Sequence, residues 1–436
     1  MTPLTSDGAQ WRFLALTALR WGPVGLFVPV LVLLPLDKGL TLGQVGLTVA
    51  VQGLVVLVLE LPTGGLADAW GRRPILLVAG IVAIASTVVF LSASTVAGFA
   101  AAYLLQGVYR ALDSGPLEAW YVDAVHAAPD ADQNRRGLER EVERGLSRAG
   151  AVLGIAIAAG ALIGGGLVAI GDVGPFEALA LPVVASLVLQ VLSLVAVLTL
   201  MPEVSHGEGA RRALDAVRQA PRTVADGVRL LRASPVLLAI VAVELFWGFG
   251  SATYEALLPI RLTEILDDPE EAAVIVGPAG SAAWLASALG AALVPWLIRI
   301  VGTTSAAALL RVLHGGFVVL MGLLAGVVGV VVAYLVAYAA HGAGNPPHMS
   351  LLHRQVGGEL RATAISINSM MAQAAGALGV LTLTAVADQE SARVAMYLGG
   401  AVLAVAAPLY IPAWRQERAR RTDERRQTAE PTGVRQ

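Results

Sequence analysis

Long stretches without Asp, Glu, Lys or Arg run through most of the 436 residues and constrain the fold more than any other feature. A helix that spans a bilayer needs about 20 consecutive, mostly apolar residues. Such stretches occupy residues 39–59, 75–109, 149–171, 178–202, 272–298, 312–353, 362–387 and 394–414. Two of them, 75–109 and 312–353, are long enough for two spans each. Residues 12–35 and 235–259 complete the set, although each contains an ionisable side chain. The sequence therefore predicts twelve spans.

The length and composition of these stretches predict helices. Strands of a membrane barrel are about 10 residues long and alternate in hydropathy, which these runs do not. The chain is 56% hydrophobic and only 14% charged, whereas soluble domains are about 25% charged. The expected class is therefore an all-α integral membrane protein.

Composition also excludes several kinds of chemistry. The chain contains no cysteine, so it has no thiolate nucleophile and no cysteine-ligated metal. Its one lysine, Lys38, is followed by Gly39, so no Walker A phosphate-binding loop is present. A net charge of −2 gives no basic footprint for nucleic acid. We expect no enzyme activity, cofactor or metal site, and no nucleic-acid partner.

Basic residues predict the orientation in the membrane. Positively charged loops stay in the cytoplasm. With both termini inside, 24 of the 30 basic residues lie in cytoplasmic segments or at their edges. We therefore expect a multi-pass protein of a bacterial-type inner membrane with cytoplasmic N- and C-termini.

The longest polar stretch between spans divides the chain into two sets of six helices. Residues 1–202 are predicted to form one six-helix bundle and residues 235–414 the other. Between them, residues 203–234 carry arginines beside regularly spaced apolar residues, which suits an amphipathic helix at the headgroup surface or a solvated linker helix. The charged tail, residues 415–436, has no apolar period and is expected to be disordered.

A short loop between spans two and three carries the most specific motif. It reads Gly64-Gly65-Leu66-Ala67-Asp68-Ala69-Trp70-Gly71-Arg72-Arg73. Small residues allow close approach of helices in a membrane, and glycine allows a tight reversal of the chain. The motif resembles the signature loop of the major facilitator superfamily, Gly-x-x-x-Asp-(Arg/Lys)-x-Gly-Arg-(Arg/Lys), at the same place in the topology. It departs from that pattern at Ala69, where a basic residue is usual.

The resemblance implies a twelve-helix transporter built from two pseudo-symmetric six-helix bundles. A weaker copy of the loop supports two related halves, because Gly302 follows Pro295-Trp296-Leu297-Ile298-Arg299 at the position that corresponds to Gly71. Weak internal symmetry is expected of transporters built from repeats. Arg299 stands where Asp68 would be, so the second loop has lost the acid.

Span four continues the resemblance. The family commonly has an intramembrane arginine here and an acid at the inner end, and Arg110 and Asp123 match. The resemblance implies that Asp123 meets Arg72 and Asp68 when the inner side is closed. The expected conformational latch consists of Gly64, Asp68, Gly71, Arg72, Arg73 and Asp123. Two interfacial acids in water are the alternative.

A glycine-rich segment of span five, Gly160-Ala161-Leu162-Ile163-Gly164-Gly165-Gly166, is similar to the antiporter motif of drug exporters. Ala161 replaces the proline of that motif, which weakens the inference of export. Close helix packing is the simpler interpretation of these glycines.

Ionisable residues inside a span are costly and face a cavity or a partner, so each is a functional candidate. Glu244 lies nine residues into span seven, about 13 Å along a helix that rises ~1.5 Å per residue. It is predicted to couple transport to protons or, alternatively, to pair with Arg311. Arg110 and Asp113 could pair within span four, and Arg20 needs Glu60 or Asp113 as its counterion. The further candidates for solute binding are Trp247, Tyr254, Asn368 and Gln373.

Three polar residues of span ten share one helical face at i, i+4 and i+7: His341, Asn345 and His348. Such a face could be a metal or proton site. Pro346 and Pro347 are expected to break the helix across it, and no carboxylate accompanies it in the sequence. A polar helix end is therefore the expected interpretation.

Together these features predict a secondary transporter of a small molecule that works by alternating access in the lipid bilayer. Proton-coupled efflux of a drug-like or amphipathic solute by a monomer is the expected form, and an uptake symporter or uniporter is the alternative. A membrane-embedded enzyme is disfavoured because no HExxH or Gly-x-Ser-x-Gly motif is present. A non-transporting sensor would need a larger soluble domain.

Overall fold

A computed structural model of the chain describes residues 4–129, 135–202, 225, 229–357 and 361–429, with the side chains of 60–69, 135–136, 361–362, 420–421 and 423–429 left out. The described chain is helical throughout, apart from one isolated β-bridge between Val173 and Phe176. Ten of its helices are long and apolar enough to cross a membrane.

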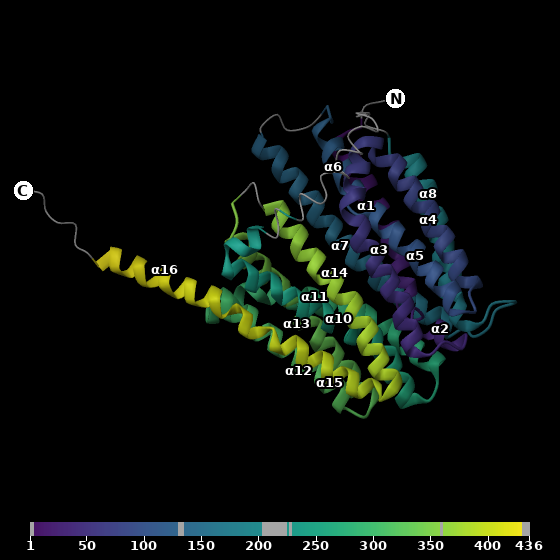
Figure 1. Ribbon diagram of the computed structural model, residues 1–436. Helices are drawn as coiled ribbons and strands as arrows, with labels where there is room; N and C mark the ends of the chain where they lie inside the picture. The colour runs from purple at the N-terminus through teal and green to yellow at the C-terminus, as the bar shows by residue number, and fades with distance from the viewer. Residues whose placement is uncertain (1–3, 130–134, 203–224, 226–228, 358–360, 430–436) are drawn as a thin grey trace, which may run out of the picture.

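The first half contains α1 (Ser6–Phe27), α2 (Leu33–Asp37), α3 (Leu42–Trp70), α4 (Arg72–Ser92), α5 (Val96–Asp113), α6 (Pro116–His126), α7 (Arg135–Val168), the 3-10 turn η1 (Ala178–Ala180) and α8 (Leu181–Leu200). The second half contains α10 (Pro235–Leu266), α11 (Pro269–Val301), α12 (Thr303–Leu323), α13 (Val327–His353), α14 (Arg361–Gln389), α15 (Ala392–Val405), the 3-10 turn η3 (Ala407–Tyr410) and α16 (Ile411–Ala429). Figure 1 shows the two sets side by side.

Twelve passes through the bundle confirm the predicted fold class. The ten apolar helices account for ten passes, α1 supplies another, and α5 with α6 forms the twelfth. That last pass is interrupted because Gly115 adopts φ +94° and Pro116 starts α6. A proline at the first helical position is compatible with a helix start, since its missing N–H has no partner there.

The predicted repeat is visible in the backbone. Gly71 joins α3 to α4 with φ 96° and ψ 154°, and Gly302 joins α11 to α12 with φ 85° and ψ 161°. Only glycine populates this region readily. The two helices that follow have the same length of 21 residues.

The C-terminal tail differs from the expectation of disorder. Helix α16 continues through residues 415–429 and extends away from the bundle (Figure 1). The segment is rich in Arg, Glu, Gln and Ala and lacks Gly and Pro until Pro431. These residues favour helix even without an apolar face. Most of the expected amphipathic segment, residues 203–234, lies outside the described residues.

The bundle has two ends, which we call terminal and distal. The terminal end is where α1 begins and α16 ends, and the distal end contains the turns at Lys38, Gly171 and Asp267. Four exposed tryptophans lie at or near the terminal ends of the passes through the bundle: Trp11, Trp70, Trp296 and Trp414. Tryptophan is enriched at the headgroup level of membranes.

Apolar packing joins the two halves near the distal end. One buried cluster there contains residues of both halves, among them Leu33, Val45, Leu257 and Leu383. Nearer the terminal end, each half has a separate cluster of its own. The described halves are therefore closed against each other distally, and α3 packs on α14 while α7 packs on α11.

Glycines allow the helices of both pairs to approach each other closely. A Cβ on Gly277 of α11 would lie 2.7 Å from the Ala161 carbonyl and from the Gly165 Cα of α7. A Cβ on Gly46 of α3 would collide with Thr384 of α14. The Asp388 Oδ1 of α14 also accepts a hydrogen bond of 3.2 Å from the Leu42 N–H, in the first turn of α3.

Candidate functional site

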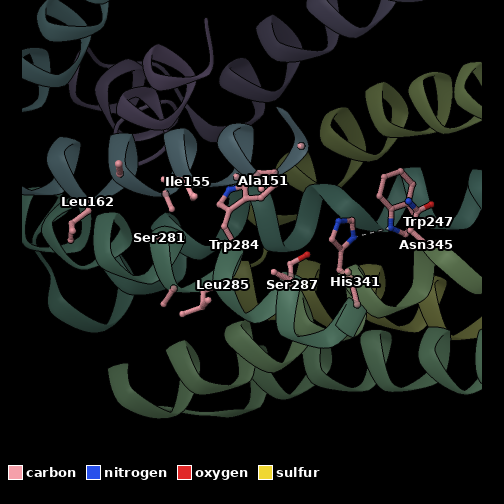
Figure 2. Close-up of a pocket in the computed structure, with 18 of the residues that line it drawn as sticks. Ala151, Ile155, Leu162, Trp247, Ser281, Trp284, Leu285, Ser287, His341 and Asn345 are labelled. Carbon is pink, nitrogen blue, oxygen red and sulfur yellow. Dashed lines mark hydrogen bonds between the residues drawn. The ribbon is translucent and has the colours of Figure 1, made fainter. Parts of the chain in front are cut away.

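A cavity of about 1180 Å³ lies between α7 of the first half and α10, α11, α12, α13 and α14 of the second. It is the size of a site for a small organic molecule. Figure 2 shows side chains that line it, with Ile155 and Leu162 on α7 and Trp247, Trp284 and His341 on the second half.

The two walls of this cavity differ in chemistry. The α7 wall is made of Gly150, Ala151, Gly154, Ile155, Ala158, Ala159 and Leu162. The second half supplies every polar side chain of the lining: Glu244, Trp247, Ser281, Trp284, Ser287, Arg311, His341, Asn345 and Ser369. A solute with one apolar and one polar face complements such a site.

Glu244 is the centre of a buried polar network behind the cavity. Its Oε1 lies 3.3 Å from Arg311 Nη2 and 3.2 Å from His348 Nε2. Only 9% of the Glu244 side chain and 5% of the Arg311 side chain are exposed. The pairing with Arg311, the alternative considered from sequence, is therefore present, and Glu244 also lines the cavity.

His348 has partners on both ring nitrogens. Its Nε2 faces two acceptors, the Glu244 carboxylate and Asn368 Oδ1 at 3.1 Å, while Nδ1 lies 2.8 Å from the Tyr410 hydroxyl. The arrangement fits a neutral ring that carries its proton on Nε2 and accepts from Tyr410. The carboxylate beside this helical face is Glu244 of α10, which lies on another helix.

The expected helix break at Pro346 and Pro347 is wrong. Helix α13 runs through both prolines. Prolines are tolerated in membrane helices because neighbouring groups satisfy the freed backbone. Pro346 has no N–H to donate to the carbonyl of Gly342, and Gly342 lines the cavity.

A second cluster surrounds His341. Its Nδ1 lies 3.4 Å from Trp247 Nε1 and 3.2 Å from the Tyr254 hydroxyl. The indole N–H can only donate, so Nδ1 is the acceptor and the His341 proton is on Nε2. The neighbouring ring of His314 is buried, and neither of its nitrogens has a hydrogen-bond partner among the described residues.

The first half has its own buried ion pair. Arg20 of α1 binds the Asp113 carboxylate through Nε and the Asp113 carbonyl through Nη2, and its Nη1 lies 3.3 Å from Glu118. Asp113 is therefore the counterion of Arg20, one of the two that the sequence offered, and the alternative pairing with Arg110 on the same helix is not the one formed. Arg110 is exposed and borders a smaller pocket with Gln373 of α14.

The expected latch is described only in part. Arg72 Nε lies 3.8 Å from Asp123 Oδ2, and Arg73 Nη2 donates to the Leu198 carbonyl at 2.6 Å. Both contacts lie within the first half, so neither joins the two halves. The side chains of Glu60, Gly64 and Asp68 lie outside the described residues.

Metal ligation has no support in this site. Among the described residues, no group of three or more His, Asp and Glu side chains is arranged to hold a metal ion.

These features define a helical membrane protein with a solute-sized cavity between two repeated halves. The sequence model of the Major Facilitator Superfamily matches residues 13–380. The chain belongs to this family of membrane transporters, as the signature loop predicted.

Solved structures show the same fold at low sequence identity. The nucleoside transporter NupG is 13% identical with a TM-score of 0.73 and covers 93% of this chain and 99% of its own. A bacterial homologue of the human lysosomal transporter Spinster, inward-facing and occupied, is 14% identical with a TM-score of 0.75, covering 95% and 98%. The human organic anion transporter MFSD10 is 17% identical with a TM-score of 0.58, covering 92% and 99%. No curated protein sequence matches the chain.

Proposed function

We propose that this chain couples the movement of a small amphipathic solute to protons by alternating access. The observation that carries the proposal is the position of Glu244. Its carboxylate lines the cavity and also contacts Arg311 and His348. A group that touches both the solute space and a buried charge network can link the binding of a proton to the binding of a solute.

The described state is consistent with one end of a transport cycle. The distal contacts are closed, and the cavity lies on the terminal side of them. We place the terminal end in the cytoplasm, since most arginines gather there. The protein then opens inward in an inner membrane, and one chain encloses the whole cavity, which suits a monomer.

The direction of transport needs separate support. Export was expected from the family resemblance and from the apolar, acid-containing spans, and the glycine-rich segment of α7 gave it weakened support because Ala161 replaces the proline. In the structure Gly160 and Gly165 pack closely on α1 and α11, so these glycines support helix packing and do not favour export.

The test is solute flux driven by an imposed pH gradient in proteoliposomes, with a set of fluorescent amphipathic cations, anions and neutral dyes. Glu244→Gln is expected to abolish pH-driven accumulation while downhill exchange continues. Glu271→Gln, at an exposed position at the distal start of α11, is the matched control and should transport normally. Unchanged pH-driven flux in Glu244→Gln would refute the proposal.

A further inference from the structure

The charges of the cavity are few and balanced. Of the described residues that line it, only Glu244 and Arg311 are charged. They pair with each other, so the site is neutral while Glu244 is ionised. A charged solute must therefore replace one member of this pair or bind when one member has lost its charge.

Arg311 has binding capacity left, and Glu244 has less. Glu244 Oε1 already faces two donors, Arg311 Nη2 and His348 Nε2. By contrast, the buried Nε–H of Arg311 has no hydrogen-bond partner among the described residues. A guanidinium has five N–H donors in a planar fork that matches an anionic oxygen pair. A buried donor without a protein partner, in a residue that lines a cavity, is open to an acceptor there.

Only one member of the pair can lose its charge at physiological pH. Arginine stays protonated in proteins, whereas a buried carboxyl can accept a proton. The titratable groups around Glu244 are Tyr254 on α10, Arg311 and His314 on α12, His341 and His348 on α13, and Tyr410 in η3. No titratable residue of α7, α11 or α14 lines the described cavity. Protonation of Glu244 leaves Arg311 as an unpaired cation in the site.

We infer that the cavity takes a small organic anion, whose charged oxygens bind Arg311 when a proton has neutralised Glu244. The apolar part of the solute then lies against the α7 wall and the indoles of Trp247 and Trp284. This inference rests on the proposed function and specifies its substrate class. Proton and solute bind together, so they move in the same direction, and a proton gradient directed inward drives uptake.

A solute of the opposite charge meets a less favourable site. An amine would compete with Arg311 and His348 for the Glu244 carboxylate, and by taking its charge it would leave Arg311 buried without its counterion. Removing one partner of a buried ion pair is strongly unfavourable. Exchange of a cation against a proton therefore has no support from this geometry.

The test is binding to the purified full-length protein, measured by quenching of the cavity tryptophans. The probes are para-nitrobenzoate and para-nitrophenyl phosphate, with para-nitrobenzamide and para-nitrobenzylamine as neutral and cationic analogues of similar size. At least one anion should bind ten times more tightly or better than either analogue, and its binding should strengthen as the pH is lowered. Binding should take up about one proton per anion from a weakly buffered solution.

Substitutions at Glu244 and Arg311 test their separate roles, proton binding and anion binding. Glu244→Gln should bind the anion with little dependence on pH and without proton uptake. Arg311→Gln should lose the preference for anions, while Arg299→Gln, an exposed arginine on α11, should keep it. A double variant, Glu244→Gln with Arg311→Gln, removes the buried charge from both partners, and it should be folded and bind the three kinds of probe about equally.

The outcomes separate this inference from the proposed function. If neither anion binds more tightly than the amide and the amine at any pH, or if binding releases protons, the inference is overturned. Should Glu244→Gln still abolish pH-driven flux in that case, the proposed function stands. Should pH-driven flux survive in Glu244→Gln while the anion preference depends on Arg311, the proposed function fails and the anion site stands.

Discussion

Buried charges of the first half have a structural role that is separate from the cavity. Arg20 holds Asp113 with two groups of its guanidinium, and both side chains are about nine-tenths buried. The pair ties α1 to the end of α5, close to the interruption at Gly115. It therefore fixes the point where the fourth pass changes direction.

Asp113→Asn is expected to destabilise the protein by about 3–5 kcal/mol, because it leaves the Arg20 charge buried without a counterion. Thermal unfolding in detergent measures the loss. Glu118→Gln is the control, because the Glu118 side chain is 44% exposed and such pairs contribute about 0–1 kcal/mol. An equal loss in both variants would contradict the assigned role of Asp113.

Sequence reasoning found some of these residues and missed others for a physical reason. Intramembrane charges are costly, so Glu244, Arg311 and Arg20 stand out in an apolar span without any structure. His348 was set aside because its carboxylate partner lies on another helix, 104 positions earlier in the chain. Asp113 had two possible arginine partners, Arg110 by helical spacing and Arg20 as a counterion, and spacing within one helix could not decide between them.

Two glycines at helix junctions determine how adjacent helices reverse at the terminal end. Gly71 and Gly302 share nearly the same backbone angles, in a region that side chains with a Cβ avoid. The repeat was recognised from the sequence because this requirement restricts the position to glycine. For Pro346 and Pro347 the prediction from sequence failed. A helix break was expected there, but α13 continues through both prolines because a membrane helix tolerates them.

Gly302→Ala should reduce stability by about 1–3 kcal/mol, the cost of forcing a Cβ into this backbone region. The control is Gly316→Ala in α12, where no atom lies within 4 Å of the added Cβ. That change should be neutral or should stabilise the helix by about 0.5–1 kcal/mol. Thermal unfolding of the two variants in the same detergent gives the comparison, and similar melting temperatures would contradict it.

The α7–α11 contact near the distal end depends on glycines, which have no side chain. Gly277→Ala would place a methyl group 2.7 Å from the α7 backbone, so the two helices must separate or shift. The distance between spin labels at Val173→Cys and Glu271→Cys should therefore increase. Gly166→Ala is the control, because nothing lies within 4 Å of its added Cβ. An unchanged distance distribution in Gly277→Ala would rule out this role for the contact.

At the scale of the whole molecule, the apolar clusters of the described residues join the halves at the distal end. A single apolar cluster joins them distally, and each half has its own cluster nearer the terminal end. The number of helices and the division into halves could be predicted from hydropathy and charge. The sequence could not predict which end is closed, because a transporter that alternates between two states has the same sequence in both.

Chemical labelling tests the closed end directly, since the chain has no cysteine of its own. A membrane-impermeant maleimide should reach Ser281→Cys, in the cavity wall, from the side that carries the termini. Val45→Cys, buried in the shared distal cluster, should react slowly from either side. Asp388→Ala removes the acceptor of the hydrogen bond from the first turn of α3 and should speed the reaction at Val45→Cys. Fast labelling of Val45→Cys in the unaltered background would contradict distal closure.

The shared distal cluster has a thermal consequence. To open outward, the halves must separate at this apolar cluster and bring other apolar surfaces together at the terminal end. Unless the two areas match, the exchange changes the heat capacity, because wetted hydrocarbon stores more heat than dry hydrocarbon. Turnover should then follow a curved Arrhenius plot, because chilling weakens the apolar association that holds the distal cluster together.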